Sequence, residues 1–330
     1  MRQWFVLGIA LFFTACQTQT PLDQVISQQY VHKYGFPLSE QEWEQRPQDG
    51  QVIETLQNGV AITRSYENGL LHGATTHTFP HNTVVEKSVL YNHGTLLKET
   101  LYDLSGMPMR EELYEFDDRT IITLWDEKGS PLSVEEYDGE YLVEGKYYTA
   151  EHELEAKVDG GCGERVKRDR SGLLISRDLM QNGLIAERTT YHPNGQIHTL
   201  SHYHDYQLHG EQVKYSATGR PLLRLHWNHG ILDGQKIAYR NGFKVAEIPY
   251  ANGQKQGTEC HYDDLGNLTA EIEWQDDKKH GCSKLYGDDG LVETDWFFNN
   301  QPVTAQKFEL LENREQMLAE FSGEAEVVNE

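Results

Sequence analysis

The sequence predicts an all-β protein: an elongated antiparallel β-meander of hairpin repeats with roughly twenty strands and short helices at its two ends. Three observations predict it. Aromatic residues recur every 11 or 12 residues, Asn-Gly pairs recur between them, and the chain is rich in Gly (29) and Tyr (18) but only 38% hydrophobic. Such a chain has turns and rings but few aliphatic side chains for a thick core, which favours a thin sheet.

The first fifteen residues are typical of a secretion signal. Met1 and Arg2 give a positive start, and residues 4–13 form an apolar run shorter than the about 20 residues that span a bilayer. The run ends in FTAC, residues 13–16, which resembles the lipobox of bacterial lipoproteins, where the cysteine is acylated and becomes the mature N-terminus. We therefore expect Cys16 to carry the lipid; a plain signal peptide and a chance cysteine are the alternatives.

Gln17 stands where some bacterial lipoproteins carry the Asp that retains them in the inner membrane. An exported, membrane-anchored lipoprotein is therefore expected, with the outer membrane preferred over the inner membrane.

Residues 16–49 are predicted to form a tether and an N-terminal helical cap. The stretch PLDQVISQQYVHKYG places apolar residues at helical spacing, namely Leu22, Val25, Ile26 and Tyr30. Ser39 and Glu42 then make a capping box for a second short helix that holds Trp43.

Residues 50–307 are predicted to form the repeat array. Glycines spaced by 23 or 24 residues have an aromatic residue seven places before and a tyrosine five places after, as seen at Gly210, Gly234, Gly257 and Gly281. Segments such as KIAYR and TAEIEW alternate in the period-two pattern of a strand. The Asn-Gly pairs supply the positive φ angles of tight hairpin turns, so these glycines are corners and not a phosphate-binding loop, which needs one glycine cluster that opens a helix. The pairs begin at Asn68, Asn182, Asn194, Asn241 and Asn252.

The rings are predicted to stack in one column along the sheet, each cross-strand pair contributing about 0.2–1 kcal/mol. Between Tyr148 and Tyr191 the aromatic places hold Val158, Asp169 and Met180, so this stretch is a degenerate copy of the repeat. An exposed aromatic platform for sugars or peptides is the alternative role of the column.

The last element, residues 308–330, is predicted to be a C-terminal capping helix with an acidic tail. Its apolar residues fall near one helical stripe that suits the covering of the last strand, and they are Phe308, Leu311, Leu318 and Phe321.

The repeat resembles the MORN-type repeat, in the bacterial variant of YwqK-family antitoxins. The matching pattern Y-x-N-G-x-x-x-G occurs at residues 66–73 and 250–257, with a close copy at 227–234. A tyrosine follows five residues later, at Tyr239 and Tyr262, and the resemblance covers about residues 50–304. It implies a β-hairpin array that acts as a protein-interaction or membrane-associating scaffold. The antitoxin label implies neutralisation of a cognate toxin.

The charge restricts the partners. The formal net charge is −23, and removal of residues 1–15, which include Arg2, leaves 28 Lys and Arg against 52 Asp and Glu, a net charge of −24. Such a field repels phosphate backbones and anionic lipid headgroups, so nucleic acid is not expected as a partner.

Few residues suggest chemistry. His202, His204 and Asp205, with His226 one repeat later, are the best metal candidate, against solvent-facing strand residues. Cys162 in DGGCGE is an exposed nucleophile, a turn thiol or a disulfide partner, and no base is evident for it.

Cys260 and Cys282 fall on one face of successive repeats, which allows a disulfide. No catalytic residue, metal site or cofactor is assigned.

The sequence therefore predicts a non-enzymatic, lipid-anchored scaffold that binds another protein of the cell envelope. A YwqK-like antitoxin and a carbohydrate- or peptidoglycan-binding surface are the alternatives.

Overall fold

A computed structural model of the chain describes residues 24–46 and 48–327, with side chains described as far as residue 318. The chain divides into two units, Met1–Asp117 and Asp118–Glu330. The antiparallel all-β meander is confirmed. The described residues hold 28 strands. This exceeds the roughly twenty expected of such a repeat array, partly because β5–β6, β20–β21 and β23–β24 are each one interrupted strand.

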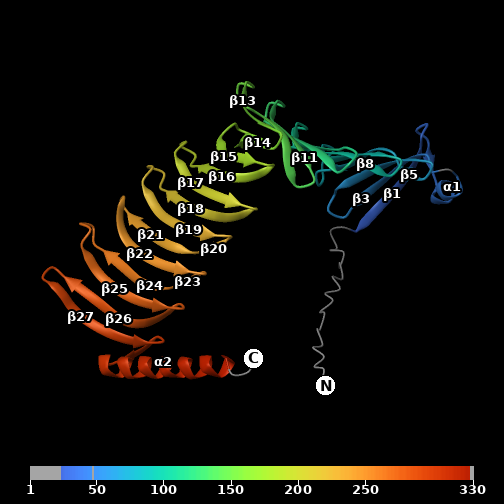
Figure 1. The fold of residues 1–330 in the computed structure, drawn as a ribbon. Helices are drawn as coiled ribbons and strands as arrows, with labels where there is room; N and C mark the ends of the chain where they lie inside the picture. The colour runs from blue at the N-terminus through green and yellow to red at the C-terminus, as the bar shows by residue number, and fades with distance from the viewer. Residues whose placement is uncertain (1–23, 47, 328–330) are drawn as a thin grey trace, which may run out of the picture. The chain divides into compact units, whose positions relative to one another are not determined.

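Unit 1 is an antiparallel sheet with one short helix (Figure 1). Its elements are β1 (Val25–His32), β2 (Pro37–Leu38), α1 (Glu40–Glu44), β3 (Gly50–Leu56), β4 (Ala61–Glu67), β5 (Leu70–Leu71), β6 (Gly73–Thr78), β7 (Val85–Asn92), β8 (Thr95–Tyr102) and β9 (Pro108–Tyr114).

The first predicted helix is wrong, because the stretch around Tyr30 is the strand β1. It pairs with β3 in the register Tyr30↔Val52, so the sheet begins well before residue 50. Val, Ile and Tyr favour strands, and the spacing of the apolar residues fits a half-buried strand as well as a helix. The open edge of β3, which needs a pairing partner, decides in favour of the strand. The second predicted helix is confirmed as α1: its capping box forms between Ser39 and Glu42, and Trp43 is buried against the ring of Tyr30 at 5.6 Å.

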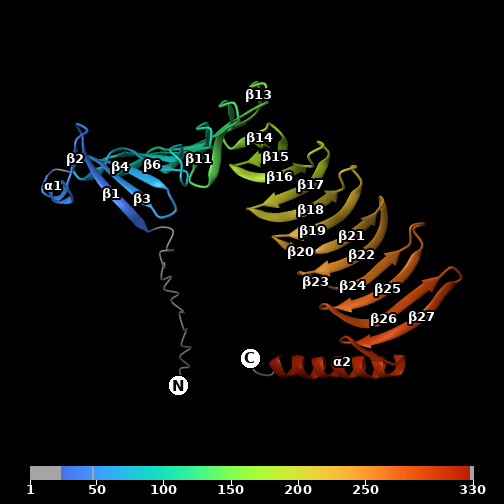
Figure 2. The same cartoon turned by 180° about the vertical axis from the view of Figure 1, so that it is seen from behind.

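Unit 2 holds the longer array, in which strands β15 to β27 lie side by side (Figures 1 and 2). Its elements are β10 (Arg119–Trp125), β11 (Pro131–Asp138), β12 (Tyr141–Tyr148), β13 (Leu154–Asp159), β14 (Cys162–Arg168), β15 (Leu174–Gln181), β16 (Leu184–Tyr191), β17 (Ile197–His204), β18 (Gln207–Tyr215), β19 (Pro221–Asn228), β20 (Ile231–Leu232), β21 (Gly234–Arg240), β22 (Phe243–Ala251), β23 (Gln254–Lys255), β24 (Gly257–Tyr262), β25 (Leu268–Gln275), β26 (Lys278–Gly287), β27 (Gly290–Phe298), β28 (Gln301–Val303) and α2 (Ala305–Val327).

Two kinds of turn alternate along most of the sheet, and two-residue turns replace the longer loop at residues 241–242 and 288–289. Tight turns such as Asn252-Gly253 have φ of 50° and 84°, as the Asn-Gly pairs predict. The other kind is a five-residue loop, as at residues 263–267, where the Asp263 carboxylate accepts hydrogen bonds from the amides of Leu265 (2.9 Å) and Asn267 (2.8 Å). Asn194-Gly195 lies in a five-residue loop, where the amide of Gly195 donates to the carbonyl of His192. Of these two residues only the glycine has positive φ.

The tight turns are joined to one another by hydrogen bonds, which we call the turn ladder. In this ladder the second residue of a turn donates its amide to a carbonyl one repeat earlier, as Gly253 does to Leu232 (2.8 Å). The first residue donates to a side chain, as Asn252 does to Asp233 (3.4 Å). The same two-bond pattern recurs at residues 68–69, 93–94, 276–277 and 299–300, with side-chain acceptors Asp49, His72, Gln256 and His280.

The aromatic rings do not stack as predicted. The cross-strand partner of each ring in one row is a glycine with positive φ, as in Gly210↔Trp227 and Gly257↔Trp274. The rings therefore lie two strands apart, roughly 9–10 Å, which exceeds the about 4.5–7 Å of a ring pair. Lysines cover some of them instead, since the Lys255 ammonium lies 4.1 Å from the Trp274 ring centre.

The rings also form two rows on opposite faces, not one column. Trp274 and Glu271 are three residues apart on β25 and so point to opposite faces. The hydroxyl of Tyr286 donates to Glu271 at 2.6 Å, which places Tyr286 on the face opposite Trp274. Tyr286 lies five residues after Gly281, whose cross-strand partner is Phe297, and this odd number places the two kinds of ring on opposite faces.

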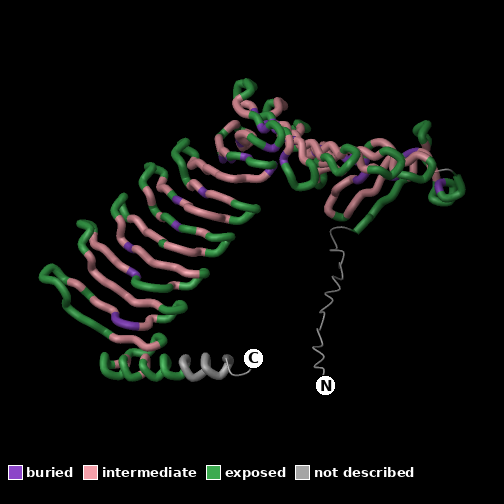
Figure 3. Tube along the Cα trace, viewed as in Figure 1, coloured by how far each residue is buried: buried purple, intermediate pink, exposed green. Residues whose placement is uncertain are grey.

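The degenerate stretch of the repeat forms a small core, and we call residues 131–191, β11 to β16, the curled segment. The amide of Leu142 donates to the carbonyl of Gly183 at 3.2 Å, although three strands lie between them in sequence. Val158 and Met180 stand at ring places of the repeat, and they pack with Leu142, Tyr147 and Val166. Figure 3 shows buried residues gathered here and only scattered along the later strands.

Helix α2 lies against the last strands, and it begins at Ala305, three residues before the predicted boundary. Phe308 contacts the rings of Trp296 (5.1 Å) and His280 (5.3 Å), so the N-terminal part of the helix covers the end of the sheet. Leu318 is exposed, so the predicted apolar stripe is not buried along its whole length.

Candidate functional site

One edge of the regular array exposes an apolar side chain at every hairpin. These residues, which we call the apolar edge, are Ile197, Leu222, Phe243, Leu265 and Leu291. Each lies in, or one or two residues after, a successive turn on the same side of the sheet, and the five side chains are between 41% and 87% exposed. The opposite edge carries the turn ladder, whose later turns are Asn252-Gly253, Asp276-Asp277 and Asn299-Asn300. The two edges of one sheet thus differ in chemistry.

A cluster of carboxylate, tyrosine and cation recurs on one face. Glu271 accepts hydrogen bonds from Tyr286 (2.6 Å) and Lys284 (3.3 Å). The hydrogen bond from Tyr286, with the charge of Lys284, lowers the pKa of Glu271. In unit 1, Tyr114 donates to Glu112 at 2.7 Å, and burial together with this carboxylate raises the pKa of Tyr114 to about 12. These clusters hold tyrosine hydroxyls as donors and stabilise the sheet.

The most buried cluster of this kind lies in the curled segment. Arg165 makes a bidentate ion pair with Glu135, with nitrogen–oxygen distances of 2.7 and 2.9 Å. Tyr137 and Tyr147 donate to the same carboxylate at 2.7 and 3.0 Å. Burial alone raises the pKa of Glu135, but Arg165 and the two hydroxyls outweigh it and hold the pKa below its usual value. Every oxygen is satisfied, so we interpret the cluster as structural.

The cysteines do not form the predicted disulfide, and the three that the structure describes are free. Cys260 is in β24 and Cys282 in β26, with β25 between them. Two strand spacings separate their backbones by roughly 9–10 Å, beyond the about 7 Å limit of a disulfide. Burial and the neighbouring Glu273 raise the pKa of Cys282, which makes it a poor nucleophile.

Cys162 opens β14 and is exposed, as its glycine-bounded context predicts. Cys16 lies outside the described residues, so its lipidation stays a prediction.

The structure does not bring the predicted metal candidates together. His202 bonds the carbonyl of Glu211 at 2.7 Å, whereas His226 lies on β19, with β18 between the two histidines. His204 instead meets the rings of His209 (5.7 Å) and His229 (5.9 Å) at the turn ladder.

A second histidine cluster in unit 1 was missed in the sequence. His72 and His93, with Glu67, lie at the turn ladder at places equivalent to His209 and His229. The sequence signal was a pair of His-Gly dipeptides 21 residues apart: His72-Gly73 at the repeat glycine and His93-Gly94 at the following tight turn.

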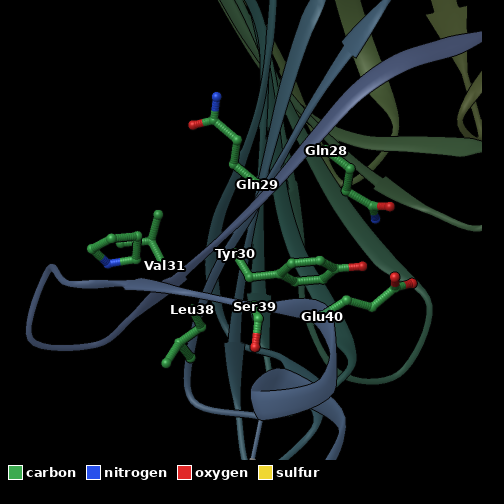
Figure 4. Close-up of a pocket in the computed structure, with 8 residues that line it drawn as sticks. Gln28, Gln29, Tyr30, Val31, Leu38, Ser39 and Glu40 are labelled. Carbon is green, nitrogen blue, oxygen red and sulfur yellow. The ribbon is translucent and has the colours of Figure 1, made fainter.

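An open pocket lies beside β1, β2 and the start of α1, with a volume of about 410 Å³. Figure 4 shows Gln28 and Tyr30 on one side of β1 with Glu40, and Gln29 and Val31 on the other side. Because the polar groups do not converge on one point, this pocket is a weak candidate for a ligand site.

Comparisons with known proteins add little. No family model matches the chain, and no curated protein matches its sequence. Among solved structures, BamB from Moraxella catarrhalis is similar at 10% identity, over 76% of this chain and 82% of BamB, with a TM-score of 0.15. A porin-like protein from Bacteroides uniformis is similar at 11% identity, over 86% of this chain and 94% of that protein, with a TM-score of 0.14. At these TM-scores neither likeness carries an argument, and the resemblance to MORN-type repeats stays a prediction.

Within the described part of the chain, neither helix has both the length and the apolar character that a membrane-spanning helix requires.

Proposed function

We propose that the protein is an exported, lipid-anchored scaffold that binds another protein of the bacterial envelope through the apolar edge of unit 2, without catalysis of its own. The observation that carries this proposal is the regular placement of five exposed apolar side chains, one per hairpin. Successive members are two strands apart, so the row is roughly 40 Å long. A row of exposed apolar side chains repeated along one edge of a sheet fits a protein-interaction site.

The contrast with the turn ladder supports the choice of edge. The turns at both edges of β22 to β28 carry Asn, Asp or Gly, but of the two edges only the apolar edge adds exposed large apolar side chains, at Phe243, Leu265 and Leu291. The ladder edge of the array also exposes Tyr206 and Ile231, but only the apolar edge carries an exposed apolar side chain at every hairpin from β17 to β27, a regularity that folding does not explain.

The charge supports a protein partner with a basic surface. The chain carries 52 acidic against 29 basic residues. This field attracts positively charged surfaces and repels nucleic acid and anionic lipid, so anchoring falls to the acyl chains expected on Cys16.

The test is site-specific photocrosslinking in intact cells. A photoreactive amino acid replaces Phe243 or Leu265 at the apolar edge, and the matched control places it at Asn252 or Asp277 at the turn ladder. We expect one adduct of defined mass from the apolar edge and none from the ladder, and mass spectrometry of that adduct names the partner.

The companion variant Phe243→Ser, with the photoreactive group kept at Leu265, is expected to weaken the adduct at least several-fold. Equal crosslinking from both edges, or no discrete adduct from Leu265, contradicts the proposal. Palmitate labelling of the wild type but not of Cys16→Ser tests the anchor separately.

A further inference from the structure

Three metal-binding side chains converge at the turn ladder of unit 1. Glu67 is the last residue of β4, His72 lies between β5 and β6, and His93 opens the tight turn after β7. The ladder joins them, because the amide of Gly94 donates to the carbonyl of Leu71 at 2.7 Å. Residues 26 apart in sequence are thereby held side by side by backbone hydrogen bonds.

The spacing of the ligand atoms fits one small ion. Glu67 Oε2 lies 3.3 Å from His72 Nε2 and 3.9 Å from His93 Nε2, and the two imidazole centres are 4.5 Å apart. Metal–ligand bonds of about 2.0–2.1 Å at tetrahedral angles separate two ligand atoms by about 3.4 Å. Movements of a fraction of an ångström to about one ångström, within the reach of side-chain rotation, complete the site.

The turn ladder does not itself require these side chains. It uses only the Nδ1 atom of His72 and the backbone amide of His93, at 3.4 Å. At the equivalent pairs the chain places Asp233 with Asn252 and Gln256 with Asp276, so neither imidazole is needed for the turn. The His93 imidazole and the Glu67 carboxylate are additional to it.

We propose that Glu67, His72 and His93 form a binding site for a divalent transition metal ion, with Zn²⁺ as the ion of reference. Two imidazoles and one carboxylate suit Zn²⁺, and all three side chains are between 38% and 51% exposed, which leaves the fourth position to water. Bound through the Nε2 atom, His72 carries its proton on Nδ1 and gives up the long 3.4 Å hydrogen bond from His93. The ion replaces that bond and links two repeats.

Unit 2 offers an internal comparison. His204, His209 and His229 occupy the equivalent places, but their ring centres are 5.7, 5.9 and 4.8 Å apart, and His204 is drawn to Asp205 at 3.2 Å. Among the described residues, only the Glu67, His72 and His93 group brings three ligand atoms within 4.8 Å of one another. A comparison of the two clusters therefore tests whether metal binding requires converging ligand atoms or only several neighbouring histidines.

The experiment measures Zn²⁺ binding to the full chain in detergent, by equilibrium dialysis with metal analysis and by competition with a chromophoric chelator. The test variant is His72→Gln with His93→Asn, and the matched control is His209→Gln with His229→Asn. Both use residues that the chain itself places at equivalent turns, at Gln256 and at Asn252, and Asn tolerates the positive φ of 46° at residue 93. The turns should therefore fold in both variants, which circular dichroism checks.

We expect one tightly bound Zn²⁺ per chain in the wild type and in the control, and loss of that ion in the test variant. Glu67→Gln should weaken binding at least tenfold. Co²⁺ should give the visible absorption of a four-coordinate nitrogen and oxygen site in the wild type and in the control, but not in the test variant. Retention of the ion in the test variant, loss of it in the control, or no ion held by the wild type overturns the proposal.

Discussion

The curled segment and the regular array have the same repeat length and the same alternating turns, yet they are stabilised differently. In the curled segment, Leu142 and Val158 are each 1% exposed and enclose a small aliphatic core. In the array from β17 to β27, rings face glycines and the strands are held by turn bonds and exposed ion pairs. The comparison teaches that the spacing of turns sets the meander, whereas side-chain size and polarity decide whether it encloses a core.

The largest expected difference concerns arginine. Arg165→Met leaves Glu135 charged and buried, which destabilises the curled segment by about 3–5 kcal/mol. The same change at Arg224, whose 2.9 Å pair with Glu211 is exposed on both sides, should cost less than about 1 kcal/mol. Urea unfolding followed by tryptophan fluorescence measures both. Similar losses from the two variants contradict the distinction between the regions.

Leucine truncation sharpens the comparison further. Leu142→Ala removes a side chain from the enclosed core and should lower the free energy of unfolding by about 2–5 kcal/mol. Leu285→Ala in the array truncates a side chain that is 48% exposed, and the loss should stay below about 1 kcal/mol. Thermal unfolding of the two variants tests the difference, and a loss at Leu285 equal to that at Leu142 means that the array also encloses a core.

A smaller effect concerns acid. The folded pKa of Glu135 is lowered, so its stabilising contribution is present above its unfolded pKa, about 4.3, and is lost as the pH falls through the folded pKa. We expect the stability of the wild type to fall below that pH more steeply than that of Glu135→Gln. Glu211→Gln in the array is the control and should follow the wild type. Parallel curves for all three proteins rule out an acid-sensitive curled segment.

The repeat architecture was predictable because it depends on local chemistry. The positive φ angles at Asn68, Asn241 and Asn252 follow from Asn-Gly pairs, and the capping box of α1 follows from Ser39 and Glu42. The strand β1 was mistaken for a helix because its apolar positions fit both periods, and only the β3 edge decides between them.

Long-range features were harder to predict. Which face a ring occupies depends on how many residues separate it from a cross-strand pair, so Tyr286 and Trp274 came out on opposite faces. The histidine cluster of unit 1 brings together residues up to 26 apart in sequence, and its members become neighbours only through the turn ladder. The apolar edge could not be predicted before the turns were assigned, because Leu222 and Leu265 show no pattern in the sequence until the strand ends are known.

The turn ladder has a consequence for how such a chain changes length. Turns of the ladder are hydrogen-bonded to the chain one repeat away, as Gly230 is to Leu208 and Gly253 to Leu232. Excision of one full module therefore brings together two loops that already possess matching donors and acceptors, while a partial excision leaves both ends unmatched. Duplication or loss of whole modules therefore changes the length of the strand array and keeps the hydrogen bonds between the remaining turns.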